Sequence, residues 1–349
     1  MFDIISCKKT VDGILEKMPL RTKDILSRRF CIGKNNQNLK PEGETLEEIG
    51  RDYGVTRERI RQIEKKGLEM FENSSDFSNL KKPIFKIKSF IDRQGGLKRE
   101  DILKSSISPD PSFHPYILFL LKIGKEFSYQ PESDLFYAFW MTKRESLEIA
   151  EKINSFLAEV IERKKQLFPE NEILEIGKRE APNILSSTIK KKIKLKDSHI
   201  LSYIEITKKI EKNPFNEYGL SHWPEVNPKG VRDKAYLILK KEKKPLHFRE
   251  LANLIEERLQ KPVEIGTLHN ELIKNQNFVL IGRGIYALRE WGYKEGTVRD
   301  IIKQLLKERG ALLKEEIIKE VKTQRMVKES TIILNLQYFK KTKDGRYTL

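Results

Sequence analysis

The chain has 349 residues, of which 38% are hydrophobic and 34% are charged, and it carries a formal net charge of +17 with a pI near 9.5. This composition argues against a fully disordered chain and predicts several small folded domains with modest cores. The charge favours a polyanionic partner, although a lysine-rich proteome would give the same balance. No apolar run reaches 18 residues and no signal-peptide core opens the chain, so we expect a cytoplasmic protein without a membrane span.

Cysteines and histidines give no support for a metal site. Cys7 and Cys31 form no CxxC pair, the five histidines are scattered, and two lone cysteines fit a reducing compartment. We also find no HExxH motif, no phosphate-cradling glycine loop and no paired Ser, His and Asp arrangement. We therefore expect no catalytic residue, no cofactor and no enzyme activity.

Residues 1–33 are predicted to form helices, because Ile4, Val11 and Ile14 recur at helical spacing. Pro19 ends the first helix, and residues 21–30 form the next. A polar loop, KNNQNLKPEG at 34–43, leads into the following element.

The stretch 45–71, TLEEIGRDYGVTRERIRQIEKKGLEMF, predicts two short helices joined by a tight turn. Thr45 and Glu48 are spaced for a capping box at the first helix. Gly54 would end that helix in a left-handed conformation, and Thr56 would cap the second. The inward face of the second helix would consist of Ile60, Ile63, Leu68 and Phe71.

The outward face of the second helix has the chemistry of a DNA reader. Arginine can bond guanine bidentately, glutamine can read adenine, and glutamate can accept from cytosine. The alternative is an ordinary solvated helix face, but the two caps and the Gly-Val turn disfavour it. The candidate DNA-binding residues of this motif are Thr56, Arg57, Glu58, Arg59, Arg61, Gln62 and Lys65, with Arg59 and Lys65 placed to hold phosphates.

This stretch, with its core VTRERIRQIE, resembles the C-terminal DNA-binding region (region 4) of sigma-70-type transcription initiation factors. ILEKMPLRTKDILSRRFCIG at 14–33 resembles the paired helices that precede the motif in that family. The resemblance covers roughly residues 10–72. It implies reading of the −35 promoter element, and it places the base contacts on Arg57, Glu58, Arg61 and Gln62.

A sigma factor also has an aromatic-rich upstream region that melts the promoter and grips the polymerase. Only about 44 residues precede Thr45, too few for that region. We therefore expect no promoter-melting ability in this chain by itself.

The region 73–142 is predicted to be winged-helix-like after a linker at 73–82. Helical patterns at 84–94, 99–104 and 114–122 precede two aromatic segments, 127–129 and 135–140, that are typical of strands.

The region 143–230 is predicted to have a similar winged-helix-like arrangement, with helices at 144–167, 172–179 and 184–193. Its lysine run KKKIKLK, which includes Lys190 and Lys192, is either a phosphate-contacting patch or a solvated helix end.

The last 120 residues contain an internal repeat with a period near 60 residues. Leu246 aligns with Leu312, and the segment 284–288 aligns with 345–349. Each copy predicts three helices, a strand, a glycine turn and a strand, which is the winged helix-turn-helix order.

The first copy, 231–290, resembles the HARE-type helix-turn-helix domain through KPLHFRELANLI, TLHNELIKN and FVLIGRGIYAL. That family occurs in the delta subunit of bacterial RNA polymerase, in chromatin proteins and beside restriction enzymes, so the resemblance leaves DNA and protein contact both open. Thr267 would cap the third helix. His247 and His269 are better explained as structural residues than as ligands. The candidate DNA contacts here are His269, Asn270, Lys274 and Arg283.

The predicted fold class is mainly α, a helix-turn-helix module followed by tandem winged-helix (α+β) domains. The predicted domains are 1–72, 73–142, 143–230, 231–290 and 291–349. The leading hypothesis is a sigma-factor-like, sequence-specific transcription regulator that binds double-stranded DNA and the RNA polymerase core. The alternatives are a polymerase-associated adaptor and a non-specific DNA-binding protein; the target sequence, the sign of regulation and the oligomeric state are not predicted.

Overall fold

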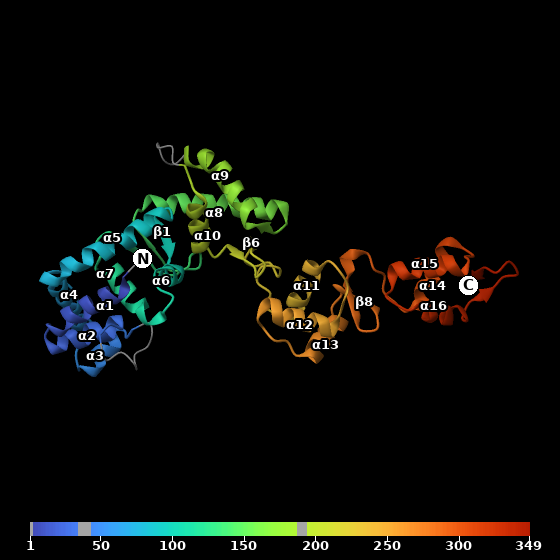
Figure 1. The fold of residues 1–349 in the computed structure, drawn as a ribbon, viewed down its shortest axis with the longest axis horizontal. Coiled ribbons are helices and arrows are strands. Elements are labelled where there is room, and N and C mark those ends of the chain that lie inside the picture. Colours follow the sequence, from blue (N-terminus) through green and yellow to red (C-terminus); the bar gives the residue numbers. More distant parts are fainter. Residues whose placement is uncertain (1–2, 34–42, 187–193) are drawn as a thin grey trace. The chain divides into compact units, whose positions relative to one another are not determined.

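A computed structural model describes residues 3–33, 43–186 and 194–349 of the chain (Figure 1). It contains two compact units, Met1–Glu211 (unit 1) and Lys212–Leu349 (unit 2), which are described separately. Helices dominate both units and the sheets are small and antiparallel, as the predicted mainly α class requires. In the described part of the chain, no helix combines the length and the apolar character that a bilayer crossing needs.

Unit 1 begins with the helices that the sequence predicts: α1 (Ile4–Glu16), α2 (Leu20–Phe30), α3 (Leu46–Asp52) and α4 (Arg57–Glu72). Asp3 caps α1 by accepting from the Ser6 N–H at 3.0 Å. The buried residues of α1 follow its helical period, and they include Ile4, Val11 and Ile14.

The predicted linker at 73–82 is wrong. A 3₁₀ turn, η2 (Ser75–Phe77), is followed at once by α5 (Ser78–Arg93). Leu80 is fully buried and continues the period of Ile84, Ile87 and Ile91. The serine-rich start and Pro83 are linker signals in isolation, but Pro83 lies inside the helix, where packing of the apolar stripe outweighs its missing N–H.

A winged-helix-like module follows α5. Its elements after α5 are β1 (Leu97–Arg99), α6 (Glu100–Ile107), η3 (Pro111–Phe113), α7 (His114–Ile123), β2 (Ser128–Gln130) and β3 (Phe139–Met141). The strands form a sheet in the order β1-β3-β2, with Met141 opposite both Leu97 and Ser128.

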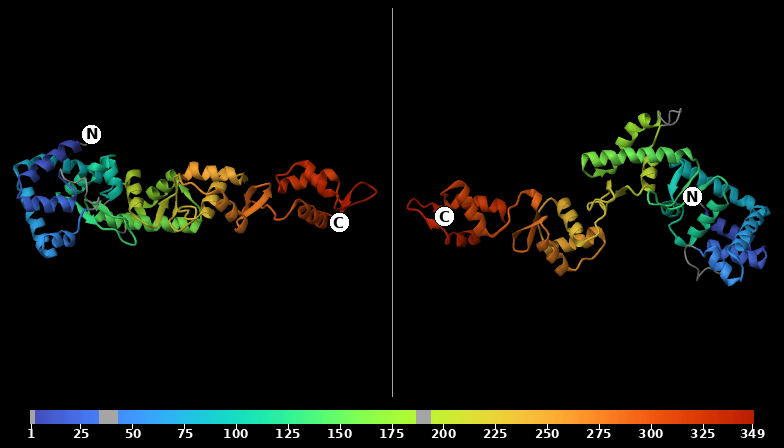
Figure 2. Two further views of the ribbon diagram at one scale, coloured as in Figure 1. Left: turned by 90° about the horizontal axis from the view of Figure 1, so that it is seen from below. Right: turned by 180° about the vertical axis from the view of Figure 1, so that it is seen from behind.

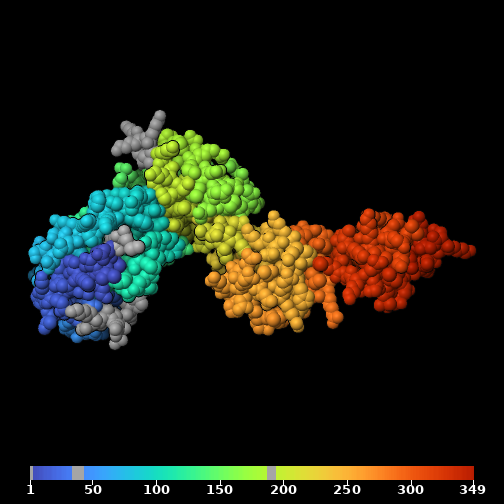
Figure 3. Space-filling view, viewed as in Figure 1, coloured from blue at the N-terminus to red at the C-terminus, as the bar shows by residue number. Residues whose placement is uncertain are grey.

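One continuous core joins the helix-turn-helix segment to this winged helix. Phe119 of α7 makes edge-on contacts with Phe30 of α2 and Phe71 of α4, at centroid distances of 5.3 and 4.9 Å. The Tyr116 hydroxyl donates to Asp12 at 2.8 Å and accepts from the Gly33 N–H at 3.0 Å. Figure 3 shows the two segments, blue and cyan to green, as one body. The finer domain boundaries stay a prediction.

The rest of unit 1 contains α8 (Glu145–Lys164), β4 (Phe168–Pro169), α9 (Glu170–Ser186) and α10 (Asp197–Ile206), and it ends within the short strand β5 (Ile210–Lys212). The break expected between 179 and 184 is absent, because α9 runs through Pro182 as one helix. Asn154 of α8 donates to the Tyr203 carbonyl at 2.7 Å, and Ser202 donates to the Leu97 carbonyl at 3.0 Å. These bonds fix α10 against α8 and β1.

Unit 2 begins with β6 (Glu217–Leu220). Its first winged helix consists of α11 (Val231–Glu242), β7 (Leu246–His247), α12 (Phe248–Leu259), α13 (Ile265–Lys274), β8 (Phe278–Gly282), β9 (Ile285–Leu288) and η4 (Arg289–Trp291). The second consists of α14 (Val298–Arg309), α15 (Lys314–Gln324), α16 (Glu329–Leu336), β10 (Lys340–Lys341) and β11 (Tyr347–Thr348).

The predicted repeat is supported at matching positions of the two copies. Leu246 pairs with Tyr286 in the first copy, and Leu312 bridges to Tyr347 in the second. Each copy surrounds its own hydrophobic cluster. Both views of Figure 2 show the three helices α14, α15 and α16 lying together near the C-terminus.

Candidate nucleic-acid interface

The helix-turn-helix forms because its local signals agree. The Thr45 hydroxyl accepts from the Glu48 N–H at 3.1 Å while Glu48 accepts from the Thr45 N–H at 2.8 Å, which confirms the capping box. Gly54 has a φ of +62°, a left-handed conformation that glycine adopts without strain. The Thr56 hydroxyl accepts from the Arg59 N–H at 3.2 Å, so Thr56 begins α4 as predicted.

A small core holds α3 and α4 at a fixed angle. Ile25 of α2, Ile49 of α3 and Ile60 of α4 are fully buried, and Val55 in the turn packs against them. Gly67 lies where α4 crosses α2, because a Cβ there would come within 2.7 Å of the Thr22 methyl group. The apolar face of α4 therefore packs against its neighbours, with Ile60 and Phe71 fully buried, and its opposite face is left to solvent.

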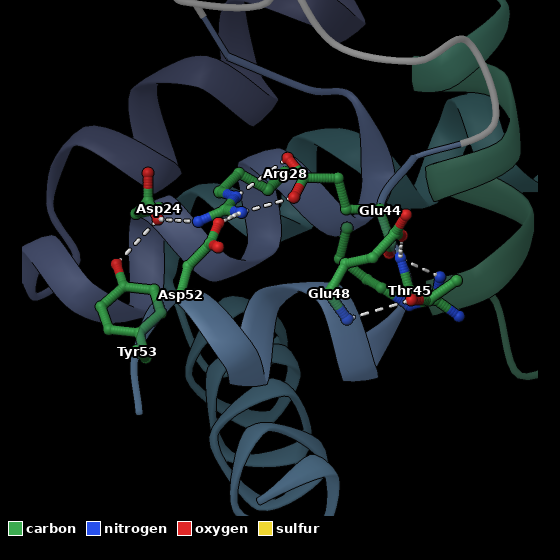
Figure 4. A network of polar contacts seen from close by, with 8 residues as sticks. Asp24, Arg28, Glu44, Thr45, Glu48, Asp52 and Tyr53 are labelled. Atoms are coloured by element: carbon green, nitrogen blue, oxygen red, sulfur yellow. Dashed lines mark hydrogen bonds and ion pairs between the residues drawn. The ribbon is translucent and has the colours of Figure 1, made fainter. Parts of the chain in front are cut away.

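A polar network that the sequence analysis missed ties α2 to α3 (Figure 4). Arg28 donates to both carboxylate oxygens of Glu44 and to Asp52. Asp24 lies 3.8 Å from the Arg28 guanidinium and accepts from the Tyr53 hydroxyl at 2.7 Å. Hydrogen bonding to Glu44 raises the pKa of Arg28, although partial burial opposes the shift. The network fixes the approach of α3 to α2.

The outward face of α4 is pre-arranged by hydrogen bonds along the helix. Arg61 donates through Nε and Nη2 to the two oxygens of Glu58, both at 2.7 Å, and the two side chains remain 55% and 57% exposed. Arg59 Nη1 donates to Gln62 Oε1 at 3.2 Å. The hydrogen bond from Arg61 holds the pKa of Glu58 below its ordinary value.

The structure brings the predicted α4 residues together on one surface. Each side chain of the candidate set Thr56, Arg57, Glu58, Arg59, Arg61, Gln62 and Lys65 is exposed. They occupy the first turns of α4, the part of a recognition helix that enters a major groove. Thr56 also has a structural role, since its hydroxyl is used by the helix cap.

The third helices of the other two modules of unit 1 are buried instead. In α7, Ile117, Phe119 and Leu120 are fully buried. In α10, Ile200 and Ser202 are fully buried. Neither helix offers a polar face of the kind that α4 presents. Lys190 and Lys192, the other predicted contacts of this region, lie outside the described residues.

The predicted contacts on the first winged helix of unit 2 differ among themselves. His269 is half-buried and packs against Phe248, with ring centroids 4.6 Å apart. Asn270 and Lys274 on α13 are exposed, as is Arg283 at the turn between β8 and β9. These three have the exposure that a contact needs, whereas His269 is held in an aromatic stack.

The predicted cap of α13 is wrong. Thr267 lies inside the helix, and Glu264 is the N-cap. The Glu264 carboxylate accepts from the Gly266 N–H at 2.8 Å and also from the Thr267 N–H. A glutamate reaching two backbone donors replaces the threonine hydroxyl that the sequence suggested.

Comparison with known proteins locates a resemblance on the same helices. The family model for sigma-70, region 4 matches residues 14–70. The RNA polymerase sigma factor SigA of Listeria monocytogenes is 38% identical over 74 residues, which is 21% of this chain and 18% of that protein. The sigma factor SigA1 of Synechococcus elongatus is 39% identical over 77 residues, 22% of this chain and 18% of that protein. The chain thus spans about a fifth of the length of these relatives. The residues that the family model matches include α3 and all but the last two residues of α4.

Proposed function

We propose that this protein is a sigma-factor-like, DNA-binding transcription regulator that reads a −35-like promoter element with the N-terminal half of α4. The observation that carries the proposal is the exposed set on α4, held on a helix whose other face packs against α2 and α3. The region 4 match at 14–70 supports it, because region 4 is the DNA-binding part of sigma-70 factors. The protein acts by binding, without catalysis.

Base reading on α4 works by exchange of hydrogen bonds. In the free protein Arg61 is bonded to Glu58. In the complex Arg61 turns to guanine O6 and N7, and Glu58 accepts from a cytosine N4 amine. Arg61 and Glu58 each give up a partner of opposite charge when they turn to the bases. With a wrong base pair the two side chains stay bonded to each other, and no binding free energy is gained. This exchange favours the correct sequence over a random one.

The same proposal includes a contact with RNA polymerase, and it includes the assignment of residues 231–290 as a HARE-type helix-turn-helix domain. Region 4 of sigma factors contacts the RNA polymerase core, and the winged helices of unit 2 add DNA or polymerase contacts. An adaptor function is the second candidate, favoured by one observation. Besides Asn270 and Lys274, the outward face of α13 carries Ile265 and Ile273, which are 44% and 62% exposed.

The test is unbiased selection of duplex DNA by the full chain, followed by titrations at several salt concentrations. We expect an enriched motif that resembles a −35 element. Arg61→Ala should weaken binding to that motif about 5- to 150-fold, equivalent to ~1–3 kcal/mol, and should barely change binding to random duplexes.

Lys65→Ala is the matched control on the same helix. It should weaken both kinds of binding alike and lower the salt slope by about one. Equal losses on both DNAs with Arg61→Ala would show that Arg61 is not a base reader. Capture of the polymerase core without any enriched motif would favour the adaptor.

A further inference from the structure

The third helix of the C-terminal winged helix exposes apolar side chains where a DNA reader would carry polar ones. On α16, Ile333 is 39% exposed and Leu334 is 62% exposed, and Tyr338, just after the helix, is 55% exposed. The other face of α16 is used in packing, since Ile332 is fully buried and Leu336 nearly so. The exposed set Ile333, Leu334 and Tyr338, here called the α16 patch, therefore has no role in the core of its own domain.

The chemistry of the α16 patch is unlike that of α4. The amide of Asn335 donates back to the Thr331 carbonyl at 2.7 Å, so it is engaged within the helix. No arginine or lysine lies between Glu329 and Phe339. Base edges are read mainly by bidentate arginine, asparagine and glutamine side chains, and the centre of the patch offers isoleucine, leucine and tyrosine. Such residues are typical of the buried centre of a protein–protein interface.

The rim of the α16 patch is basic. The Arg299 guanidinium of α14 lies 4.4 Å from the Tyr338 ring centroid. Lys340 and Lys341 follow two and three residues after Tyr338, and both are exposed. The one acidic residue between Met326 and Lys343 is Glu329, which pairs with Lys322 at 2.8 Å. An apolar centre with a positive rim selects a partner with the opposite rim charge.

We propose that the α16 patch binds an acidic polypeptide segment. Apolar side chains of the partner cover Leu334, Ile333 and Tyr338, and its carboxylates face Arg299, Lys340 and Lys341. A second copy of this chain is a poor occupant, because it would bring two basic rims together. Duplex DNA is a poor occupant as well, because it would leave the exposed leucine and isoleucine against a polar groove. The proposal does not depend on the function assigned to α4.

The experiment is selection of a displayed library of random 20-residue peptides by the full-length protein. Clones that bind a Leu334→Ser/Tyr338→Ser double variant are removed. We expect surviving clones to be rich in Asp and Glu with leucine or aromatic residues interspersed. For such a clone, Leu334→Ser alone should weaken binding about tenfold or more. Because both positions are exposed, the variants should keep the circular dichroism spectrum of the parent.

Two variants sharpen the result. Leu20→Ser removes an 84% exposed leucine on α2 and should leave peptide binding unchanged. Lys340→Glu/Lys341→Glu should weaken acidic clones while leaving the apolar patch intact. The proposal is overturned if no clone distinguishes the parent from the double variant, or if the surviving clones are basic. It is also overturned if random duplex DNA displaces them, or if Leu334→Ser abolishes a dimer seen by sedimentation.

Discussion

The helices α4 and α7 of unit 1 are each the third helix of a three-helix arrangement, but they present very different faces to solvent. The helix α4 presents charged and amide side chains to solvent over its first turns, whereas α7 is buried at six of its ten positions. Both follow a pair of helices in a compact trio. The architecture alone therefore does not determine which helix presents side chains suited to base reading; the chemistry of the outward face determines it. In this unit, α7 packs against α4 through the contact between Phe119 and Phe71.

The largest effect should come from the contact between the two helices. Phe119→Ala removes a fully buried ring that touches both Phe30 and Phe71. We expect the free energy of unfolding of unit 1 to fall by about 3–5 kcal/mol, measured by urea denaturation. Phe85→Ala is the control, since Phe85 is 66% exposed on α5 and should change stability by less than ~0.5 kcal/mol. A loss below ~1 kcal/mol at Phe119 would mean that α7 does not support α4.

A smaller effect should come from the crossing of α4 and α2. In Gly67→Ala the added methyl would lie 2.7 Å from Thr22 Cγ2 and 3.1 Å from Leu26 Cδ1. Overpacking lowers the free energy of unfolding by ~1–3 kcal/mol, whereas the higher helix propensity of alanine raises it by ~1 kcal/mol. We therefore expect the free energy of unfolding to fall by about 1 kcal/mol.

Gly13→Ala provides the matched comparison for Gly67. Gly13 is also helical, in α1, but an added Cβ would meet no atom within 4 Å. Urea denaturation should therefore show a gain of up to ~1 kcal/mol. If both substitutions stabilise the protein, α4 and α2 are not in close contact at Gly67.

The cap of α4 should contribute about as much. Thr56→Ala removes the hydroxyl that accepts from the Arg59 N–H, and caps of this kind contribute roughly 0.5–2 kcal/mol. We expect a loss of about 1 kcal/mol in thermal or urea unfolding, with Lys66→Ala on the same helix nearly neutral. An unchanged stability would show that α7 and the core hold α4 without its cap.

Glu58→Gln should have the smallest effect on stability. It should instead change which DNA sequences the protein selects. Glu58 is exposed, so breaking its pair with Arg61 should change unfolding by less than ~0.5 kcal/mol. The sequences selected by the variant should lose a cytosine preference at one position, because an amide nitrogen replaces one carboxylate oxygen. An unchanged selected motif would exclude Glu58 from base reading.

The helix-turn-helix was predictable because its signals are local. Thr45 and Glu48 are three residues apart, and Gly54 and Thr56 punctuate the turn between two short helices. Each of these features was confirmed, and the exposed face of α4 was identified correctly. The DNA-contact roles of that face stay predictions.

What the sequence did not reveal depends on distant partners. The Arg28 network joins residues 16 and 24 positions apart, and no local pattern indicates such pairs. The helix α7 is apolar on nearly every side, and an apolar pattern shows that a helix is covered without showing what covers it. The missed start of α5 has the same origin, since Leu80 is buried by residues far along the chain.

The shared core has a consequence for how this protein can be divided. A fragment ending near residue 72 would expose the faces of Phe30 and Phe71 that Phe119 of α7 covers in the whole chain, and it would remove the later half of the core that they share with Leu26. Contiguous exposed apolar surface of this kind promotes aggregation. A fragment that contains the helix-turn-helix and folds by itself therefore has to extend at least through β3, and insertions tolerated between ordinary tandem domains should be rejected at this junction.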